Sequence, residues 1–203
     1  MDTTNQFGPE LPTTVKSRVR RAAKRANYQK EAVYQLVDEL KLGHVGFIQS
    51  GEVVIIPLTV WRKGDFLYFH VANKSRLQKL VDAGETICIS FAQYDEWVLA
   101  KSAFHHSANY RSAVLFCRGE RVHDSREFDE AFKVIMNDIE PDRWGQVRPP
   151  NIQERKGTAL MRLTIEEGSF KSRSGAPTDN KEDQNLTVWS GVKSVCPFHP
   201  TSI

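Results

Sequence analysis

A lysine, a serine and an arginine follow one another at Lys74, Ser75 and Arg76, directly after an apolar, aromatic strand predicted over residues 66–71. A helix with an apolar stripe is predicted to begin at this triplet and to end at Gly84. A helix start offers free N–H groups and the positive end of a dipole. An ammonium, a hydroxyl and a planar guanidinium beside them favour a phosphate. The triplet therefore predicts a binding site for a phosphorylated small molecule held against a sheet.

A second polar segment, residues 101–111, is dense in hydrogen-bond donors and aromatic rings. Asn109, Arg111 and the adjoining Ser112 suit hydrogen bonding to a polar heterocycle or a phosphate, although a turn with ordinary caps and a salt bridge would use the same residue types. His105 and His106 point in opposite directions on an extended chain, so we expect no metal site. No G-x-S-x-G elbow is present, which argues against a hydrolase triad.

The elements around these segments predict a mainly β domain with helices, of the α+β class. Helices are predicted over residues 29–41 and after a capping Asp124. Pro57 cannot donate to a ladder, so its strand is predicted to be bulged there or to be an edge, with room for a ligand beside the backbone. Antiparallel strands joined by hairpin turns favour a closed or nearly closed barrel of six to seven strands. The predicted strands are residues 44–49, 53–62, 66–71, 86–91, 96–103, 111–123 and an alternating run over 159–165.

The composition is that of a soluble globular protein, with 203 residues of which 40% are hydrophobic and 26% charged. We expect one domain over residues 15–196, a disordered tail over residues 1–14 and a short tail over residues 197–203. No apolar run has the length of a membrane span, and no signal peptide is predicted. Three widely spaced cysteines indicate buried thiols in a reducing compartment, so we expect a cytoplasmic protein that does not contact a membrane.

The charge is concentrated near the N-terminus, where six lysines and arginines fall within residues 16–25 and no acid lies between Glu10 and Glu31. Such a run is typical of an arm that binds nucleic acid. It is more often a solvated arm that packs across a partner subunit or places an arginine near an anionic ligand. Few aromatic residues accompany it, so we expect no nucleic-acid partner.

Taken together, these segments resemble the pyridoxamine 5′-phosphate oxidase-like superfamily of FMN-binding split barrels. Within it, the chain is most similar to the flavin-nucleotide-binding group that includes nitroimidazole-resistance proteins. The similarity runs from residue 17 to about residue 195 and is most specific over residues 104–112. Further matching segments are residues 17–21, 43–47, 55–57, 67–70, 74–76, 143–144, 147–150, 165–167 and 188–192.

The resemblance implies a homodimer with FMN bound between the subunits. It implies that the triplet holds the phosphate, that strand backbone near residues 55–58 follows the flavin ring, and that residues 69 and 70 flank the ribityl chain. Two tryptophans and an arginine from irregular segments would complete the site. The residues so implied are Ile55, Ile56, Pro57, Leu58, Phe69, His70, Lys74, Ser75, Arg76, Asn109, Arg111, Ser112, Trp144, Arg148 and Trp189.

The resemblance also implies an FMN-dependent oxidoreductase that passes electrons from a reduced nicotinamide to a small acceptor such as a nitroaromatic or a quinone. No acid–base pair is then needed, because the flavin supplies the chemistry. The chain ends without the Arg-Leu-His segment of true pyridoxamine phosphate oxidases, and Val71-Ala72-Asn73 stands where many members have a small Gly-Ser pair. Oxidation of vitamin B6 is therefore not expected. The alternative is a protein that binds flavin, haem or a deazaflavin without turnover, for storage, sensing or detoxification.

Overall fold

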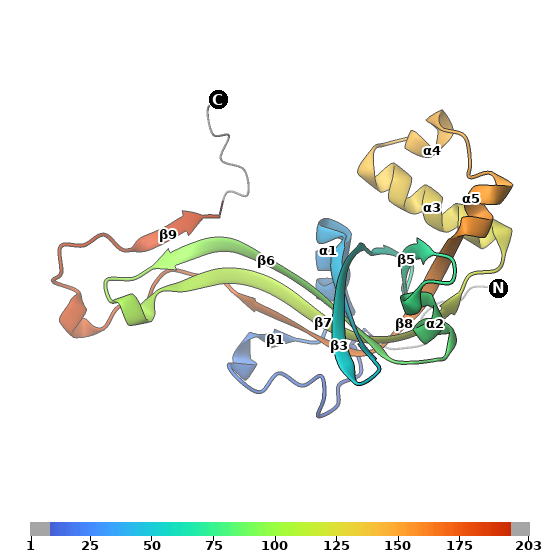
Figure 1. The fold of residues 1–203 in the computed structure, drawn as a ribbon. Coiled ribbons are helices and arrows are strands. Elements are labelled where there is room, and N and C mark those ends of the chain that lie inside the picture. Colours follow the sequence, from blue (N-terminus) through green and yellow to red (C-terminus); the bar gives the residue numbers. More distant parts are fainter. Residues whose placement is uncertain (1–8, 196–203) are drawn as a thin grey trace.

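The computed structural model describes residues 9–195. Nine strands form one antiparallel sheet along the path β3-β2-β6-β7-β8-β5-β4, with β1 added to β8 and β9 added to β6 (Figure 1). The strands are β1 Ala26–Asn27, β2 Leu42–Gln49, β3 Glu52–Thr59, β4 Trp61–Lys63, β5 Phe66–Ala72, β6 Ile87–Leu99, β7 Ser107–Arg121, β8 Thr158–Arg173 and β9 Gly191–Ser194. The helices are α1 Lys30–Leu40, α2 Arg76–Asp82, α3 Ser125–Ile139, α4 Arg143–Gln146 and α5 Ile152–Gly157, with 3₁₀ turns η1 Ala23–Arg25, η2 Ala103–His105 and η3 Lys181–Asp183.

The main core lies inside the curved sheet. Alternate strand residues such as Val45, Phe69, Ile89, Leu115 and Leu163 are fully buried there. The end strands β3 and β4 do not pair with each other among the described residues, so the barrel is split. The expected α+β antiparallel split barrel is thus confirmed, with seven strands on the main path and two short additions.

A second core lies outside the barrel, under α3. Trp61, Tyr68 and Leu160 on one side meet Phe128 and Ala131 of α3 on the other. The indole N–H of Trp61 donates to the carbonyl of Ala131 at 2.9 Å, which satisfies the one polar group that this buried ring carries. The barrel wall is therefore packed on both faces beside β5.

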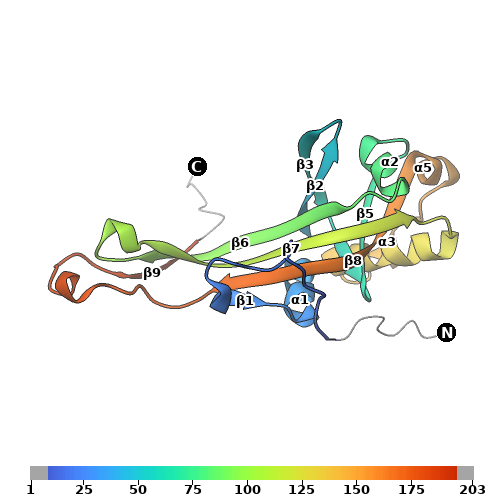
Figure 2. The same ribbon diagram turned by 90° about the horizontal axis from the view of Figure 1, so that it is seen from below.

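Strands β6 and β7 continue past the barrel and form a long arm (Figure 2). The far end of the arm carries η2 and β9, and β9 pairs with β6 through Val98 and Val192. Large apolar side chains remain accessible there, since Trp97 is 44%, Phe104 89% and Trp189 61% exposed. Isolated apolar residues on a surface are ordinary, but such a group on a projecting arm is typical of a contact surface.

Residues 9–14 depart from the expected N-terminal tail, because they pack on the barrel. Leu11 is 4% exposed and its N–H donates to the carbonyl of Tyr28 at 2.8 Å. The carbonyl of Pro12 accepts from the N–H of Gly168 on β8. One leucine in a polar stretch is too weak a signal for sequence analysis. The remaining predicted tail residues, 1–8 and 197–203, lie outside the described residues.

Glu167 on β8 holds the segment that follows. Its carboxylate accepts hydrogen bonds from the hydroxyls of Thr14 at 2.5 Å and Ser17 at 2.7 Å and forms an ion pair with Lys16 at 2.7 Å. Burial alone would raise the pKa of Glu167, but these contacts outweigh it and lower the pKa from 4.5 to about 2.

We expect the stability that this contact provides to be fully present above pH 4.5 and to be lost as the pH falls toward 2. The sign follows because the unfolded carboxyl group binds a proton more readily than the folded one. Urea titrations across this range should show a steeper loss for the wild type than for Glu167→Gln. Glu166→Gln, which leaves the Glu167 contacts intact, is the control and should keep the steep loss. An identical acid limb in the Glu167→Gln variant would contradict the assignment.

The described cysteines, Cys88 and Cys117, are free thiols, and Cys196 lies outside the described residues. Within residues 9–195, no helix is long and apolar enough to cross a membrane. The same residues contain no group of three or more histidine, cysteine or acidic side chains arranged for a metal ion.

Candidate functional site

The triplet Lys74-Ser75-Arg76 lies where β5 ends and α2 begins. Ser75 is the N-cap of α2, and its hydroxyl accepts from the N–H of Gln78 at 3.3 Å. Lys74 has a φ of 68°, a left-handed conformation that turns the chain sharply, and its N–H donates to the side chain of Gln78 at 2.6 Å. Both cationic side chains are exposed. The predicted turn and helix start are confirmed, and they present two cations side by side.

Arg76 extends from this turn toward the end of β2. Its guanidinium donates to the side chain of Gln49 at 3.3 Å and lies 5.8 Å from the centre of the Phe47 ring. Both partners are neutral, so the positive charge of Arg76 has no compensating carboxylate among the described contacts. A charge held in place by neutral groups is well suited to bind an anion.

The strand beside this turn, β3, has a free edge. The N–H of Val60 donates to the carbonyl of Lys41 at 2.7 Å, which makes this a hydrogen-bonded pair of the β2–β3 ladder. Because such pairs alternate with non-hydrogen-bonded ones, Val53, Ile55 and Pro57 direct their backbone polar groups away from β2. No described strand pairs on that side of β3. The prediction that Pro57 lies on an edge is confirmed.

Unpaired N–H and C=O groups on an edge strand can bind a planar heterocycle that has donors and acceptors on its rim. Ile55 is 62% exposed on the outer face, whereas Ile56 and Leu58 pack against the core. The free edge of β3 lies near the turn that carries Lys74 and Arg76, which we call the cationic turn. β5, which leads into this turn, contacts β3, and Gln49, the partner of Arg76, is in the last pair of the β2–β3 hairpin. These two features are the parts of the predicted site that one chain brings together.

Phe69 and His70 point to opposite faces of β5. Phe69 is 0% exposed in the barrel core, so its ring contributes to packing. His70 faces α3, with ring centres 6.2 Å from Trp61 and 5.5 Å from Phe132. Burial against these rings lowers the pKa of His70, because it disfavours the charged imidazolium. The aromatic partners come from β4 and α3, and no local sequence signal connects them to His70.

The three candidates on β7 already have partners within the chain. Arg111 donates to Asp95 at 2.7 Å and to Glu39 at 2.8 Å, and hydrogen bonds to these carboxylates raise its pKa. Asn109 is 3% exposed and donates to Glu96 at 2.6 Å. The Ser112 hydroxyl donates to the carbonyl of Lys171 at 3.2 Å. Arg111 is therefore neutralised before any ligand binds.

Arg111 and Ser112 also border an open pocket on the arm. It has a volume of about 390 Å³ and is lined by Ala92, Gln93, Tyr94, Tyr110, Arg111 and Ser112. Two tyrosines that face each other across the β6–β7 ladder give it an apolar character. No local pattern in the sequence connects Glu39 and Asp95 to Arg111, because they come from α1 and from the opposite strand.

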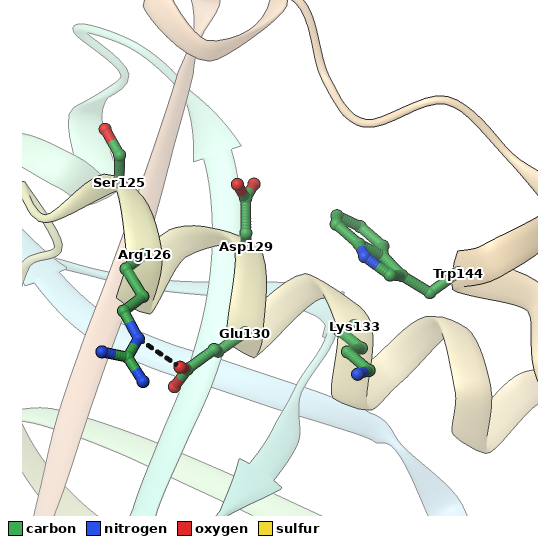
Figure 3. Close-up of a pocket in the computed structure, with 6 residues that line it drawn as sticks. All are labelled: Ser125, Arg126, Asp129, Glu130, Lys133 and Trp144. Atoms are coloured by element: carbon green, nitrogen blue, oxygen red, sulfur yellow. Dashed lines mark hydrogen bonds and ion pairs between the residues drawn. The ribbon is translucent and has the colours of Figure 1, made fainter.

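The remaining candidates have their described contacts in other parts of the chain. Trp144 covers a pocket of about 370 Å³ on α3, lined by Ser125, Arg126, Asp129, Glu130 and Lys133 (Figure 3). Arg148 is exposed and paired with Glu154 at 2.6 Å. Trp189 precedes β9, at the far end of the arm from α4 (Figure 1). None of these three side chains has a described hydrogen bond or ion pair with the triplet.

Comparison with known proteins agrees with this architecture. The family model described as pyridoxamine 5′-phosphate oxidase matches residues 29–172. The flavocytochrome Anf3 from Azotobacter vinelandii is 32% identical with a TM-score of 0.82, and the match covers 96% of this chain and 92% of that one. An FAD- and haem-binding protein from Mycobacterium smegmatis is 25% identical with a TM-score of 0.78, covering 88% and 90%.

A 5-nitroimidazole antibiotic resistance protein from Bacteroides thetaiotaomicron shares the fold, with 16% identity, a TM-score of 0.61 and coverage of 72% of this chain and 85% of that one. No curated protein matches the chain. The family model spans most of the chain, and the split barrel, its cationic turn and its free edge lie within the matched residues. The chain therefore belongs to the pyridoxamine 5′-phosphate oxidase family.

Proposed function

We propose that this protein binds a flavin nucleotide, with its phosphate at Lys74, Ser75 and Arg76 and its ring along the free edge of β3. The observation that carries the proposal is the position of an uncompensated guanidinium, Arg76, next to an unpaired strand edge. A flavin has an anionic phosphate at one end and a ring with alternating donors and acceptors at the other. The cationic turn can bind the phosphate, and the backbone of the strand edge can bind the ring.

FMN is the smallest flavin that satisfies both halves of this site. FAD contains the same phosphate and ring, and the similar proteins include an FAD- and haem-binding protein. Only the hydrogen bonds from the strand edge to the ring would favour a flavin over a deazaflavin at this site. The two flavins are therefore compared directly in the test below.

The bound flavin would supply electron transfer, and the chain would supply binding and orientation. No described pair of side chains near the triplet forms an acid–base couple, which suits a reaction driven by the cofactor. We propose transfer from a reduced nicotinamide to a small acceptor such as a nitroaromatic or a quinone. Flavin binding without turnover, for storage or sensing, is the alternative.

We propose that the functional unit is a homodimer with the flavin at the interface. The outer face of β2 and β3 supports this, since Leu42, Ile48, Val53 and Ile55 are each more than half exposed. Several exposed apolar side chains on one face of a sheet are typical of a subunit contact. A second copy could also bring Trp144, Arg148 or Trp189 to the cationic turn.

His70 favours haem as a second candidate ligand. Its imidazole packs beside both Trp61 and Phe132, and desolvation lowers its pKa, which disfavours the charged form. A neutral imidazole is the form that binds haem iron, and aromatic rings pack well against a porphyrin. Two of the similar proteins are a flavocytochrome and an FAD- and haem-binding protein.

The test is an absorption spectrum of the purified protein, followed by titration of the apoprotein with FMN and with FAD. We expect a yellow protein with a flavin spectrum, bleaching on addition of NAD(P)H and reoxidation by a nitro compound. Light scattering should give about twice 23.1 kDa. A Soret band lost in His70→Ala would support haem as well. A colourless protein that binds neither flavin would contradict the proposal, and bound flavin without bleaching would favour the non-catalytic alternative.

A further inference from the structure

A basic pocket lies where η1 and β1 meet the end of β8. It has a volume of about 470 Å³ and its lining is mostly polar. We call it the basic corner. Figure 2 shows β1 alongside the arrowhead of β8 at the start of the arm. The lining residues are Lys24, Arg25, Ala26, Asn27, Ser172, Arg173, Ser174, Ala176 and Thr178.

Backbone pairing positions the two sides of the basic corner. Ala26 pairs with Lys171 and Asn27 with Phe170, so Lys24 and Arg25 are held beside the end of β8. On the other side, Arg173 donates to the carbonyls of Gly175 and Ala176, each at 3.2 Å, and to the side chain of Asn109. These bonds fix the guanidinium and the turn after it. The cations of the corner are thus partly preorganised.

The charge of the basic corner is uncompensated. Its lining includes three cationic side chains and no carboxylate. The side chains of Lys24 and Arg25 have no hydrogen-bond or ion-pair partner in the described part of the chain, and the acceptors around Arg173 are all neutral. Like charges gathered in one concavity repel one another, and a polyanion relieves that repulsion. Hydroxyls from Ser172, Ser174 and Thr178 add neutral donors.

The basic corner is separate from the cationic turn within one chain. The turn lies near the start of β8, where Ala72 pairs with Thr158, and the corner lies at its end, next to Arg173. At about 3.3 Å per residue, the path along this strand from one end to the other is about 50 Å. One phosphorylated small molecule cannot touch both sites of the same chain.

We infer that the basic corner binds a ligand with adjacent phosphates, as in a nucleoside diphosphate or the pyrophosphate of a dinucleotide. This goes beyond the proposed flavin site at the turn and does not depend on it. Arginine and lysine together with hydroxyl donors match several phosphate oxygens at once. The concavity has the volume of a small-molecule site, and no aromatic ring lines it for stacking of nucleic-acid bases.

The test is isothermal titration of the protein with inorganic pyrophosphate. We expect binding that is at least tenfold weaker in the double variant Lys24→Ala/Arg25→Ala. Arg20→Ala/Arg21→Ala is the matched control, because it removes the same charge from the same basic run outside the pocket lining, and it should change the affinity less than twofold. Circular dichroism checks the fold of both variants, in which only exposed side chains are shortened.

Titration with FAD and FMN identifies the source of the phosphates. Weaker binding of FAD alone in the Lys24/Arg25 variant assigns the corner to the pyrophosphate of a dinucleotide flavin, contributed by a neighbouring subunit. Unchanged binding of both flavins assigns it to a free phosphorylated ligand. Absence of pyrophosphate binding would overturn the inference. Equal losses in the two double variants would also overturn it, as would tight DNA binding that both variants abolish, because each indicates diffuse charge attraction.

Discussion

Replacing Phe69 by alanine is expected to lower the free energy of unfolding by about 3–5 kcal/mol. The ring is 0% exposed in the barrel core, so its removal leaves a cavity that rigid strands on both sides cannot fill. Urea denaturation followed by circular dichroism measures the change. The matched control is Phe104→Ala, which removes the same ring from a position that is 89% exposed on the arm.

The control is expected to stay within about 0.5 kcal/mol of the wild type. A loss below about 1 kcal/mol for Phe69→Ala would contradict its place in the core and would return it to consideration as a ligand contact. The two variants therefore test whether Phe69 stabilises the core or contacts a ligand. The sequence alone does not separate these roles, because Phe69 is adjacent to His70, which faces the opposite side of the sheet.

Replacing Arg76 by alanine is expected to weaken flavin binding by about 1.5–3 kcal/mol, the scale of a charge-assisted hydrogen bond to a phosphate. This corresponds to about a 10- to 150-fold higher Kd. Fluorescence titration of the apoprotein with FMN measures it. Lys74→Ala should have a smaller effect, since its flexible side chain carries a strongly hydrated ammonium group.

Lys79→Ala is the control for Arg76→Ala. It removes an exposed positive charge one turn further along α2 and should leave the affinity almost unchanged. Arg76→Lys should be intermediate, because it keeps the charge but loses the planar pair of donors. Unchanged affinity in Arg76→Ala would remove this residue from the flavin site.

The parts of the fold that local patterns determine were predictable. The helix expected over residues 29–41 is α1, because its apolar stripe has helical spacing. The strand expected over residues 53–62 is in fact two, since Val60 bonds to Lys41 and the chain then turns so that Trp61 pairs with Tyr68. That break depends on tertiary partners, and a continuous β-branched run gives no sign of it.

The arm was the largest element that the sequence did not reveal. Residues 86–91 and 96–103 were expected as two strands, but β6 runs continuously over Ile87–Leu99. The polar stretch between them looks like a turn. In the structure it is paired with β7 across a register shift between Tyr94 and Glu96. Cross-strand pairing and β9 therefore override the local turn signal.

The candidate site was predictable where its residues are neighbours in the sequence. It was not predictable where the contacts join elements that are distant in the sequence. The triplet at Lys74 and the edge at Pro57 follow from neighbouring residues. The commitment of Arg111 to Glu39 and Asp95 depends on a helix and a strand that meet only in the folded chain. The aromatic surroundings of His70 are equally remote in sequence.

The position of β8 has a consequence for how the chain acquires its structure during synthesis. β8 pairs with β1, β5 and β7, and its Gly168 bonds to Pro12 near the N-terminus. The barrel therefore cannot close until nearly the whole chain has left the ribosome. Such distant pairing makes closure slow, and until then β5 and the N-terminal segment expose apolar residues to the solvent. The nascent protein is thus most prone to aggregation before residue 173 emerges.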